Sequence, residues 1–91
     1  SLCLNGNPIT VNGLSKLLPV LQSNFCLTSL DLSHIRLGPE MGRICGDFLK
    51  SNCTLKRLYL SHVDLQPEGA QIFAEGLLSN STLTLLFLTY N

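Results

Sequence analysis

The sequence has little charge and no excess of either sign. Only 13% of its 91 residues are charged, the formal net charge is zero, and tryptophan is absent. Because the cationic side chains are scattered along the chain, they form no basic stripe of the kind that binds nucleic acid. The cations are Lys16, Arg36, Arg43, Lys50, Lys56 and Arg57. We therefore predict no nucleic-acid partner.

The chain also lacks a long hydrophobic run. A membrane-spanning helix needs about 18 or more consecutive apolar residues. No such run occurs, although 45% of the residues are hydrophobic. No signal peptide is visible either. These absences predict that the protein has no membrane partner.

The four cysteines lack the spacings of a redox or zinc motif. There is no CxxC pair and no Cys/His spacing of the zinc type. Cys3 falls on an expected strand, Cys26 and Cys53 precede expected strands, and Cys45 falls where neighbouring repeats are apolar. We predict four free thiols in a reducing compartment, which favours a cytoplasmic location.

A period of 28 residues runs through the whole chain. The second leucine of an LxxLxL core recurs at Leu2, Leu30, Leu58 and Leu86. Three further apolar registers keep this period without an insertion: Leu4, Leu32, Leu60 and Leu88; Ile9, Leu37 and Leu65; and Leu21, Leu49 and Leu77. Such self-similarity is typical of repeat architectures. It predicts units over 1–26, 27–54 and 55–82, with a partial unit over 83–91.

Each unit reads as a strand followed by a helix. In "LTSLDLS" the apolar residues alternate, which predicts a short strand. Helical spacing then begins at Pro39 and Pro67, since proline suits a first helical turn. The expected apolar helix faces are Ile44, Cys45, Phe48 and Leu49, and then Ile72, Phe73 and Leu77. Pro19 lies inside the first helical pattern, where we expect a kink or a shortened helix.

Stacked units can bury apolar faces that a single strand and helix cannot. We therefore predict an α/β fold, a solenoid segment with a parallel sheet on its concave face and helices on its convex face. Ser-Asn pairs end each helix, and Asn52 and Asn80 also match the glycosylation pattern, which leaves glycosylation open. The chain begins and ends on expected strands with no polar cap, so we expect it to be part of a longer solenoid.

These residues resemble the leucine-rich repeat, specifically its 28-residue ribonuclease-inhibitor-like class, with the pattern LxxLxLxxNxLxxxGxxxLxxxL. The third unit matches it at Leu55, Leu58, Leu60, Leu65, Gly69, Phe73 and Leu77, and the first at Leu2, Leu4, Asn7, Ile9, Gly13, Leu17 and Leu21. In this family the asparagine side chain bonds loop backbone between turns. That asparagine is present at Asn7 and Asn91.

The two middle units depart from the family pattern. Ile35 and Val63 replace the asparagine, so their loops must satisfy backbone groups in another way. Met41 replaces the glycine of the second unit, and Gly42 follows one residue late. These departures place local loop geometry in doubt and leave the expected fold unchanged.

The resemblance implies a protein–protein interaction module with no cofactor, metal or small-molecule substrate. Similar repeats occur in ribonuclease inhibitor, nucleotide-binding leucine-rich-repeat innate immune receptors, the Ran GTPase-activating protein and tropomodulin-like actin regulators. The "SNxTLxxLxL" linker is most similar to that of the immune receptors. We predict the sensing or regulatory part of an intracellular receptor, with a GTPase-activating or actin-assembly regulator as the alternative. A structural spacer is the third reading.

Strand alternation predicts which side chains reach the concave surface. Equivalent positions form three expected rows: Cys3, Asp31, Tyr59 and Phe87; Ser1, Ser29, Arg57 and Leu85; and Gly6, His34, His62 and Tyr90. We also expect Ser33 on this surface. Arginine and aromatic residues are common interface anchors. The candidate protein-binding residues are therefore Arg57, Tyr59, His62, Leu85, Phe87, Tyr90, Asp31 and His34. The alternative is that Leu85 and Phe87 pack beneath further residues.

Catalysis and metal binding are weaker readings of the same residues. His34 and His62 occupy equivalent positions, so their side chains can approach each other and form a pH-sensitive contact. Zinc normally needs at least three protein ligands, and the pair can equally be two surface histidines copied with the repeat. Ser33, His34 and Asp31 are close in sequence, but a catalytic triad is defined by geometry. We predict neither a metal site nor an enzyme.

Overall fold

The computed structural model describes residues 2–22, 27–52 and 54–91. Strands and helices alternate along the chain as β1 (Leu2–Cys3), α1 (Val11–Gln22), β2 (Ser29–Asp31), α2 (Pro39–Ser51), β3 (Arg57–Tyr59), α3 (Gln66–Leu78) and β4 (Leu85–Phe87). The predictions for Cys26 and Cys53 lie outside the described residues, as does the position of Ser1 in its row.

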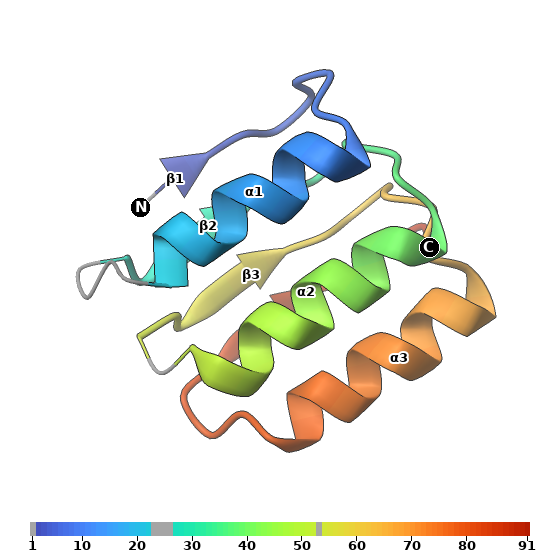
Figure 1. Cartoon of the computed structure of the whole chain (residues 1–91). Helices are drawn as coiled ribbons and strands as arrows, with labels where there is room; N and C mark the ends of the chain where they lie inside the picture. Colours follow the sequence, from blue (N-terminus) through green and yellow to red (C-terminus); the bar gives the residue numbers. More distant parts are fainter. Residues whose placement is uncertain (1, 23–26, 53) are drawn as a thin grey trace.

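The four strands form one parallel sheet in the order β1-β2-β3-β4. The three helices lie side by side on one face of this sheet (Figure 1). The register keeps the period of the sequence, because Leu30 lies opposite Leu2 and Leu58, and Leu58 lies opposite Leu86. The predicted parallel α/β arrangement is confirmed, and the unit boundaries stay a prediction.

The core lies between the sheet and the helices. Both leucines of each middle strand core, Leu30 and Leu32 in one unit and Leu58 and Leu60 in the next, are buried. The expected face of α2 is buried along its whole length at Ile44, Cys45, Phe48 and Leu49. These side chains supply most of the favourable burial, at about 1.5–3 kcal/mol for each large apolar group.

The first helix corrects one prediction. Helix α1 continues three residues beyond Pro19 to Gln22, so the helix is not shortened at Pro19, and the alternative of a kink stays a prediction. The Thr10 side chain caps the N-terminus of α1, because Thr10 Oγ1 accepts a hydrogen bond from the Gly13 N–H at 3.1 Å. Burial of Leu14 and Leu18 beneath the helix offsets the backbone hydrogen bond that proline cannot donate.

The third helix corrects another prediction, that of Ile72 on the buried face. Phe73 is buried with 2% of its surface exposed, whereas 39% of Ile72 is exposed. Within the described part of the chain no helix flanks α3 on the side away from α2 (Figure 1). The Ile72 backbone instead lies against α2, where a methyl group on Gly46 would meet the Ile72 carbonyl at 3.2 Å, and the residue stays partly in contact with solvent.

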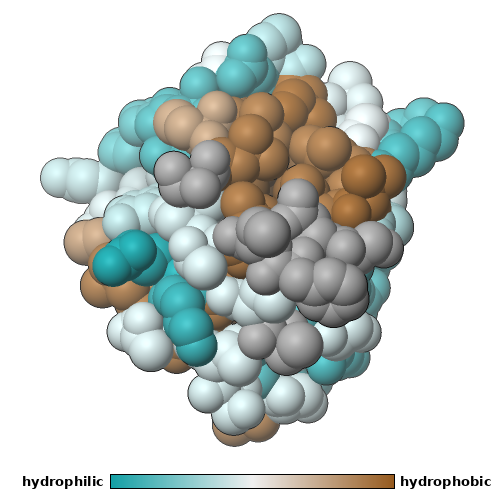
Figure 2. Space-filling model, turned by 90° about the vertical axis from the view of Figure 1, so that its left-hand side faces the viewer, coloured by the Kyte–Doolittle hydropathy of each residue, from teal (hydrophilic) through white to brown (hydrophobic). Residues whose placement is uncertain are grey.

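The first unit has a similarly uncovered side. Apart from the buried Leu14 and Leu18, several of its apolar residues are only partly buried: Leu2, Leu4, Ile9, Val11, Leu17 and Leu21. Figure 2 shows a hydrophobic patch on the side of the molecule where the N-terminus lies in Figure 1. The middle units are thus the best packed part of the structure.

The asparagines that follow α2 and α3 organise the next turn. Asn80 Nδ2 donates to the carbonyls of Leu49 and Asn52, both at 3.0 Å, while its Oδ1 accepts from the N–H groups of Thr82 and Leu83. Asn52 is itself buried and accepts backbone hydrogen bonds through Oδ1. A glycan on Asn80 Nδ2 would replace one of these donors, so the folded chain disfavours it.

The family asparagine bonds backbone between turns at Asn91, as the resemblance implies, whereas Asn7 donates to the Leu4 carbonyl of its own turn. Asn91 Nδ2 donates to the Leu60 carbonyl at 2.6 Å, and its Oδ1 accepts from the Val63 and Leu65 N–H groups at 3.1 Å. Where Ile35 stands instead, its own carbonyl accepts from the Leu37 N–H at 3.1 Å. The Leu37 N–H is thus satisfied within its own loop, whereas the Gly38 N–H donates to the Val63 carbonyl of the next turn at 3.2 Å.

Cys45 is a small apolar core residue, as predicted. It is fully buried, and its sulfur lies 3.5 Å from the sulfur of Met41. Burial raises the pKa of the Cys45 thiol to about 12, because the thiolate would lose its hydration. Cys3 is free and exposed on β1. The two described thiols therefore differ sharply in environment.

We expect iodoacetamide at pH 8 to modify Cys45 at least about a hundredfold more slowly than Cys3, because the thiolate is the nucleophile. Peptide mass spectrometry measures each rate, and both thiols should react alike in concentrated urea. The unfolded thiol ionises near pH 9 and the folded one near 12, so this group's stabilisation is lost as pH rises across that interval. Equal rates in the folded protein would contradict the burial of Cys45.

Candidate functional site

The face of the sheet opposite the helices is called here the open face. Alternation along each strand directs Leu30 and Leu58 into the core, so their strand neighbours point to the open face. Two of the predicted rows are in register there: Cys3, Asp31, Tyr59 and Phe87, and Ser29, Arg57 and Leu85. The register places these residues together, and their role in binding stays a prediction.

The third row follows the strands in a left-handed backbone conformation. Gly6, His34, His62 and Tyr90 have φ values of 74°, 64°, 58° and 61°. For a residue other than glycine this conformation costs about 1–2 kcal/mol. Inter-turn hydrogen bonds offset the cost, since the His34 N–H donates to the Ser61 carbonyl at 2.9 Å and the His62 N–H to the Thr89 carbonyl at 3.1 Å.

The repeated turn aligns the rings of this row into one stack. The ring centroids of His34 and His62 are 4.6 Å apart, and those of His62 and Tyr90 are 4.4 Å apart. The interplanar angles are 14° and 16°. The prediction that the two histidines approach each other is therefore correct, and Tyr90 extends the pair into a stack of three.

A second stack lies on the open face itself. The rings of Tyr59 and Phe87 are 5.3 Å apart with an interplanar angle of 14°. Phe87 is 43% exposed and Tyr90 79% exposed, so large aromatic surfaces from both stacks meet solvent. Held in place by neighbouring strands, these rings can contact a partner with little further loss of side-chain entropy.

The two charged side chains on the open face, Asp31 and Arg57, differ in their contacts. Asp31 Oδ1 accepts from the Ser33 N–H at 2.9 Å, and Asp31 Oδ2 lies 3.8 Å from the thiol of Cys3. Arg57 is exposed and makes no salt bridge with any residue that the structure describes. The guanidinium is therefore available to an external anion.

Ser33 corrects the sequence prediction that placed it on this surface. It is only 6% exposed, and its Oγ accepts a hydrogen bond from the Ser61 N–H at 3.1 Å. Strand β2 ends at Asp31, so the alternation does not continue to Ser33. Its hydroxyl links two turns of the fold and does not form a catalytic pair with His34.

The described residues hold no group of three histidine, cysteine, aspartate or glutamate side chains that could bind a metal ion. His34 and His62 meet face to face, with nearly parallel rings. Two ligands to one metal would instead direct their ring nitrogens toward a common point. The arrangement is that of a stack.

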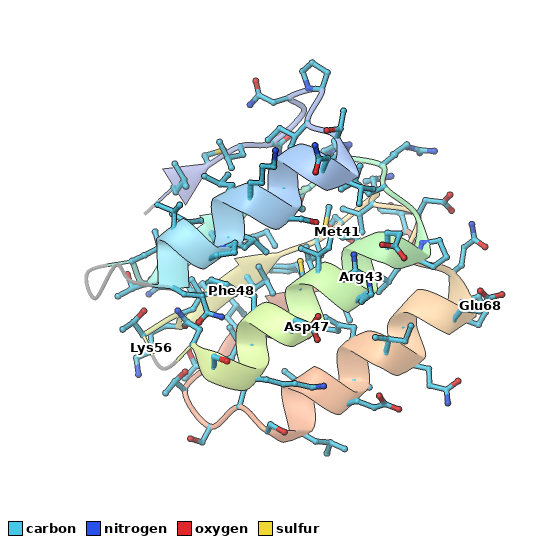
Figure 3. The ribbon with its side chains drawn as sticks, in the orientation of Figure 1. Met41, Arg43, Asp47, Phe48, Lys56 and Glu68 are labelled. Carbon is cyan, nitrogen blue, oxygen red and sulfur yellow. The ribbon has the colours of Figure 1, made fainter. Side chains whose placement is uncertain are left out.

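Sequence reasoning missed a groove between α1 and α2. It measures about 180 Å³ and is lined by Ser15, Leu18, Pro19, Gln22, Arg43, Ile44, Asp47 and Phe48. Figure 3 shows Arg43 and Asp47 on the outer side of α2. The Arg43 guanidinium donates to Glu40 at 2.7 Å and holds the pKa of that carboxyl below its usual value. In the sequence, the three- and four-residue spacing of Glu40, Arg43 and Asp47 could have indicated these charge contacts.

A comparison with known protein families matches two stretches of the repeated sequence. A family model described as Leucine Rich repeat matches residues 23–40 and 51–74. These matches support a leucine-rich repeat protein. A comparison with curated protein sequences finds no significant match.

Leucine-rich repeats are generally protein-interaction modules and are typically non-enzymatic. Their stacked turns create extended surfaces that proteins use for binding. Within the residues that the structure describes, no helix is both long and apolar enough to cross a membrane. A binding role for the open face of this chain stays a prediction.

Proposed function

We propose that this leucine-rich repeat protein binds another protein through the open face of its sheet and is not an enzyme. The contact residues are Arg57, Tyr59, His62, Leu85, Phe87 and Tyr90, with Asp31 and His34 at the polar side. One observation carries the proposal: the Tyr59–Phe87 stack and Arg57, which makes no salt bridge with any described residue, lie on a face that has no helix over it (Figure 1). The stack of His34, His62 and Tyr90 follows the ends of the same strands. Aromatic and arginine side chains dominate the binding energy of many interfaces.

We further propose that the repeats form a horseshoe solenoid of the ribonuclease-inhibitor-like class. The 28-residue register of the sheet and the asparagine-centred turns support this class. The likeness of the "SNxTLxxLxL" linker to immune-receptor repeats supports a sensing or regulatory region of a cytoplasmic receptor in innate immune signalling. A GTPase-activating or actin-assembly regulator would use the same face, so the identity of the partner separates these roles.

The test compares partner capture before and after the open face is altered. Partners recovered from cell lysate with the tagged protein are identified by mass spectrometry. We expect the combined Arg57→Ala, Tyr59→Ala and Phe87→Ala variant to lose a specific partner by at least about tenfold, because interface anchors of this type often contribute 2 kcal/mol or more. Circular dichroism verifies that the variant is folded.

A matched control alters one cation and two large apolar residues on the helical layer: Lys16→Ala, Val20→Ala and Leu78→Ala. All three side chains are exposed and lie on α1 or α3. This variant should keep the partner. If the open-face variant retains every partner while folded, the chain acts as a spacer and the proposal is wrong.

A further inference from the structure

The guanidinium of Arg57 on the open face makes no salt bridge with any residue that the structure describes. The chain has six carboxylate side chains, and four of them, Glu40, Asp47, Glu68 and Glu75, belong to α2 and α3 on the other side of the sheet. The residues outside the described ranges include no aspartate or glutamate. Of the acidic side chains, only Asp31 on β2 and Asp64 in the loop before α3 lie outside these helices.

Both of these carboxylates already have hydrogen-bond donors. Asp31 accepts from the Ser33 N–H at 2.9 Å, and Asp64 accepts from Gln66 Nε2 at 3.2 Å. Arg57 has no salt bridge among the described residues. Neither carboxylate forms a salt bridge with Arg57, so electrostatic complementarity favours a partner that brings an anion to the guanidinium.

The surroundings of Arg57 restrict the chemistry of that partner further. Leu85 lies opposite Arg57 in the register, and the stacked Tyr59–Phe87 pair follows two residues along the same strands. Two residues along a strand span about 7 Å. A carboxylate bound to Arg57 would therefore lie about 7 Å from an apolar side chain seated on the two rings, a spacing that an extended peptide provides within two residues.

We infer that the open face recognises a segment of another protein in which an aspartate or glutamate lies within two residues of a large apolar side chain. The carboxylate pairs with Arg57, whose planar guanidinium can donate two parallel hydrogen bonds. The apolar side chain covers the Tyr59–Phe87 stack. This inference rests on the proposed function and adds the class of partner.

A nucleic acid also offers an anion and a stacking ring, but the rest of the molecule does not favour it. Nucleic-acid affinity depends on several phosphate contacts made by clustered lysine and arginine. This chain has zero net charge, and its cations are dispersed over helices, loops and one strand. A single arginine beside apolar rings fits an acidic, apolar peptide better.

The first experiment selects ligands from a displayed library of random dodecapeptides against the intact protein. We expect enriched peptides to carry Asp or Glu within two residues of Phe, Trp, Leu or Ile. The best peptide, made synthetically with a fluorophore, is titrated by fluorescence anisotropy. Arg57→Glu should weaken its binding by at least about tenfold, and replacing its acidic residue by the matching amide should do the same.

Two further variants distinguish the effect of the charge at position 57 from the effects of the protein's net charge and of the planar guanidinium. Lys16→Glu makes the same charge change on α1, behind the sheet, and should leave the affinity unchanged. Arg57→Lys keeps the charge but loses the planar fork, so its affinity should fall between those of the wild type and Arg57→Glu. Circular dichroism establishes that each variant is folded.

The outcomes distinguish the inference from the proposed function. If peptides bind without an acidic residue, resist Arg57→Glu and yet are lost in Phe87→Ser, the inference is overturned and binding through the open face survives. If no selected peptide depends on Arg57, Tyr59 or Phe87, both are overturned. Tighter open-face binding of a single-stranded thymidine 20-mer than of every selected peptide would overturn the inference in favour of nucleic acid.

Discussion

Phe73→Ala should lower the free energy of unfolding by about 3–5 kcal/mol. Among the described residues Phe73 is the largest fully buried side chain, and it extends from α3 into the core. Its removal loses the transfer free energy of the ring and leaves a cavity that the surrounding leucines fill only in part. Urea denaturation followed by far-ultraviolet circular dichroism measures the change.

The neighbouring residue provides a matched control. Ile72 is also a large apolar residue of α3, but 39% of its surface is exposed. Ile72→Ala should change the stability by less than about 1 kcal/mol, since less apolar surface returns to water. If Phe73→Ala prevents folding, Phe73→Leu should still fold with a smaller loss. Equal effects of the Phe73→Ala and Ile72→Ala variants would show that α3 does not pack as described.

The contrast between these two residues shows how far the sequence predicts the fold. The 28-residue leucine period predicted the parallel sheet and its register, because each unit repeats one burial pattern. The pattern at Ile72 and Phe73 is equally apolar, and only the position of neighbouring helices decides which is covered. Periodicity identifies the apolar face of a helix, but the width of that face depends on tertiary packing.

The open face was predictable to a similar extent. Strand alternation placed Arg57, Tyr59, Leu85 and Phe87 on one surface, and the register agrees. The burial of Ser33 was not predictable from alternation, because the strand ends two residues earlier. The ring stacks depend on the left-handed turns and on side-chain rotation, which the residue pattern does not encode.

The close approach of α2 and α3 could not be predicted from the sequence. It showed Gly42 one residue later than the family glycine, as a departure. In the structure a methyl group on Gly42 would fall 2.8 Å from the Cα of Gly69 on α3. Such a distance is well inside normal carbon–carbon contact. The displaced glycine therefore permits close packing of two helix backbones.

Gly76→Ala should destabilise the protein by about 1–3 kcal/mol for the same reason. The added methyl group would lie 2.6 Å from the Cα of Gly46 on α2. Since the obstacle is backbone, no side chain can rotate away, and the two helices must separate. Thermal unfolding should show a decrease in Tm of about 4–8 °C for each kcal/mol in a protein of this size.

Two other glycines test whether contact between the helices causes this loss. A methyl group on Gly46 meets the Ile72 carbonyl at 3.2 Å, so Gly46→Ala should destabilise less than Gly76→Ala. Gly13 on α1 has only Thr10 and Ile9 side-chain atoms at 3.4–3.5 Å, and Gly13→Ala should stabilise by about 0.5–1 kcal/mol through helix propensity. A stabilising Gly76→Ala would mean that α2 and α3 are farther apart than described. In that event the added helix propensity would outweigh a contact that the helices do not make.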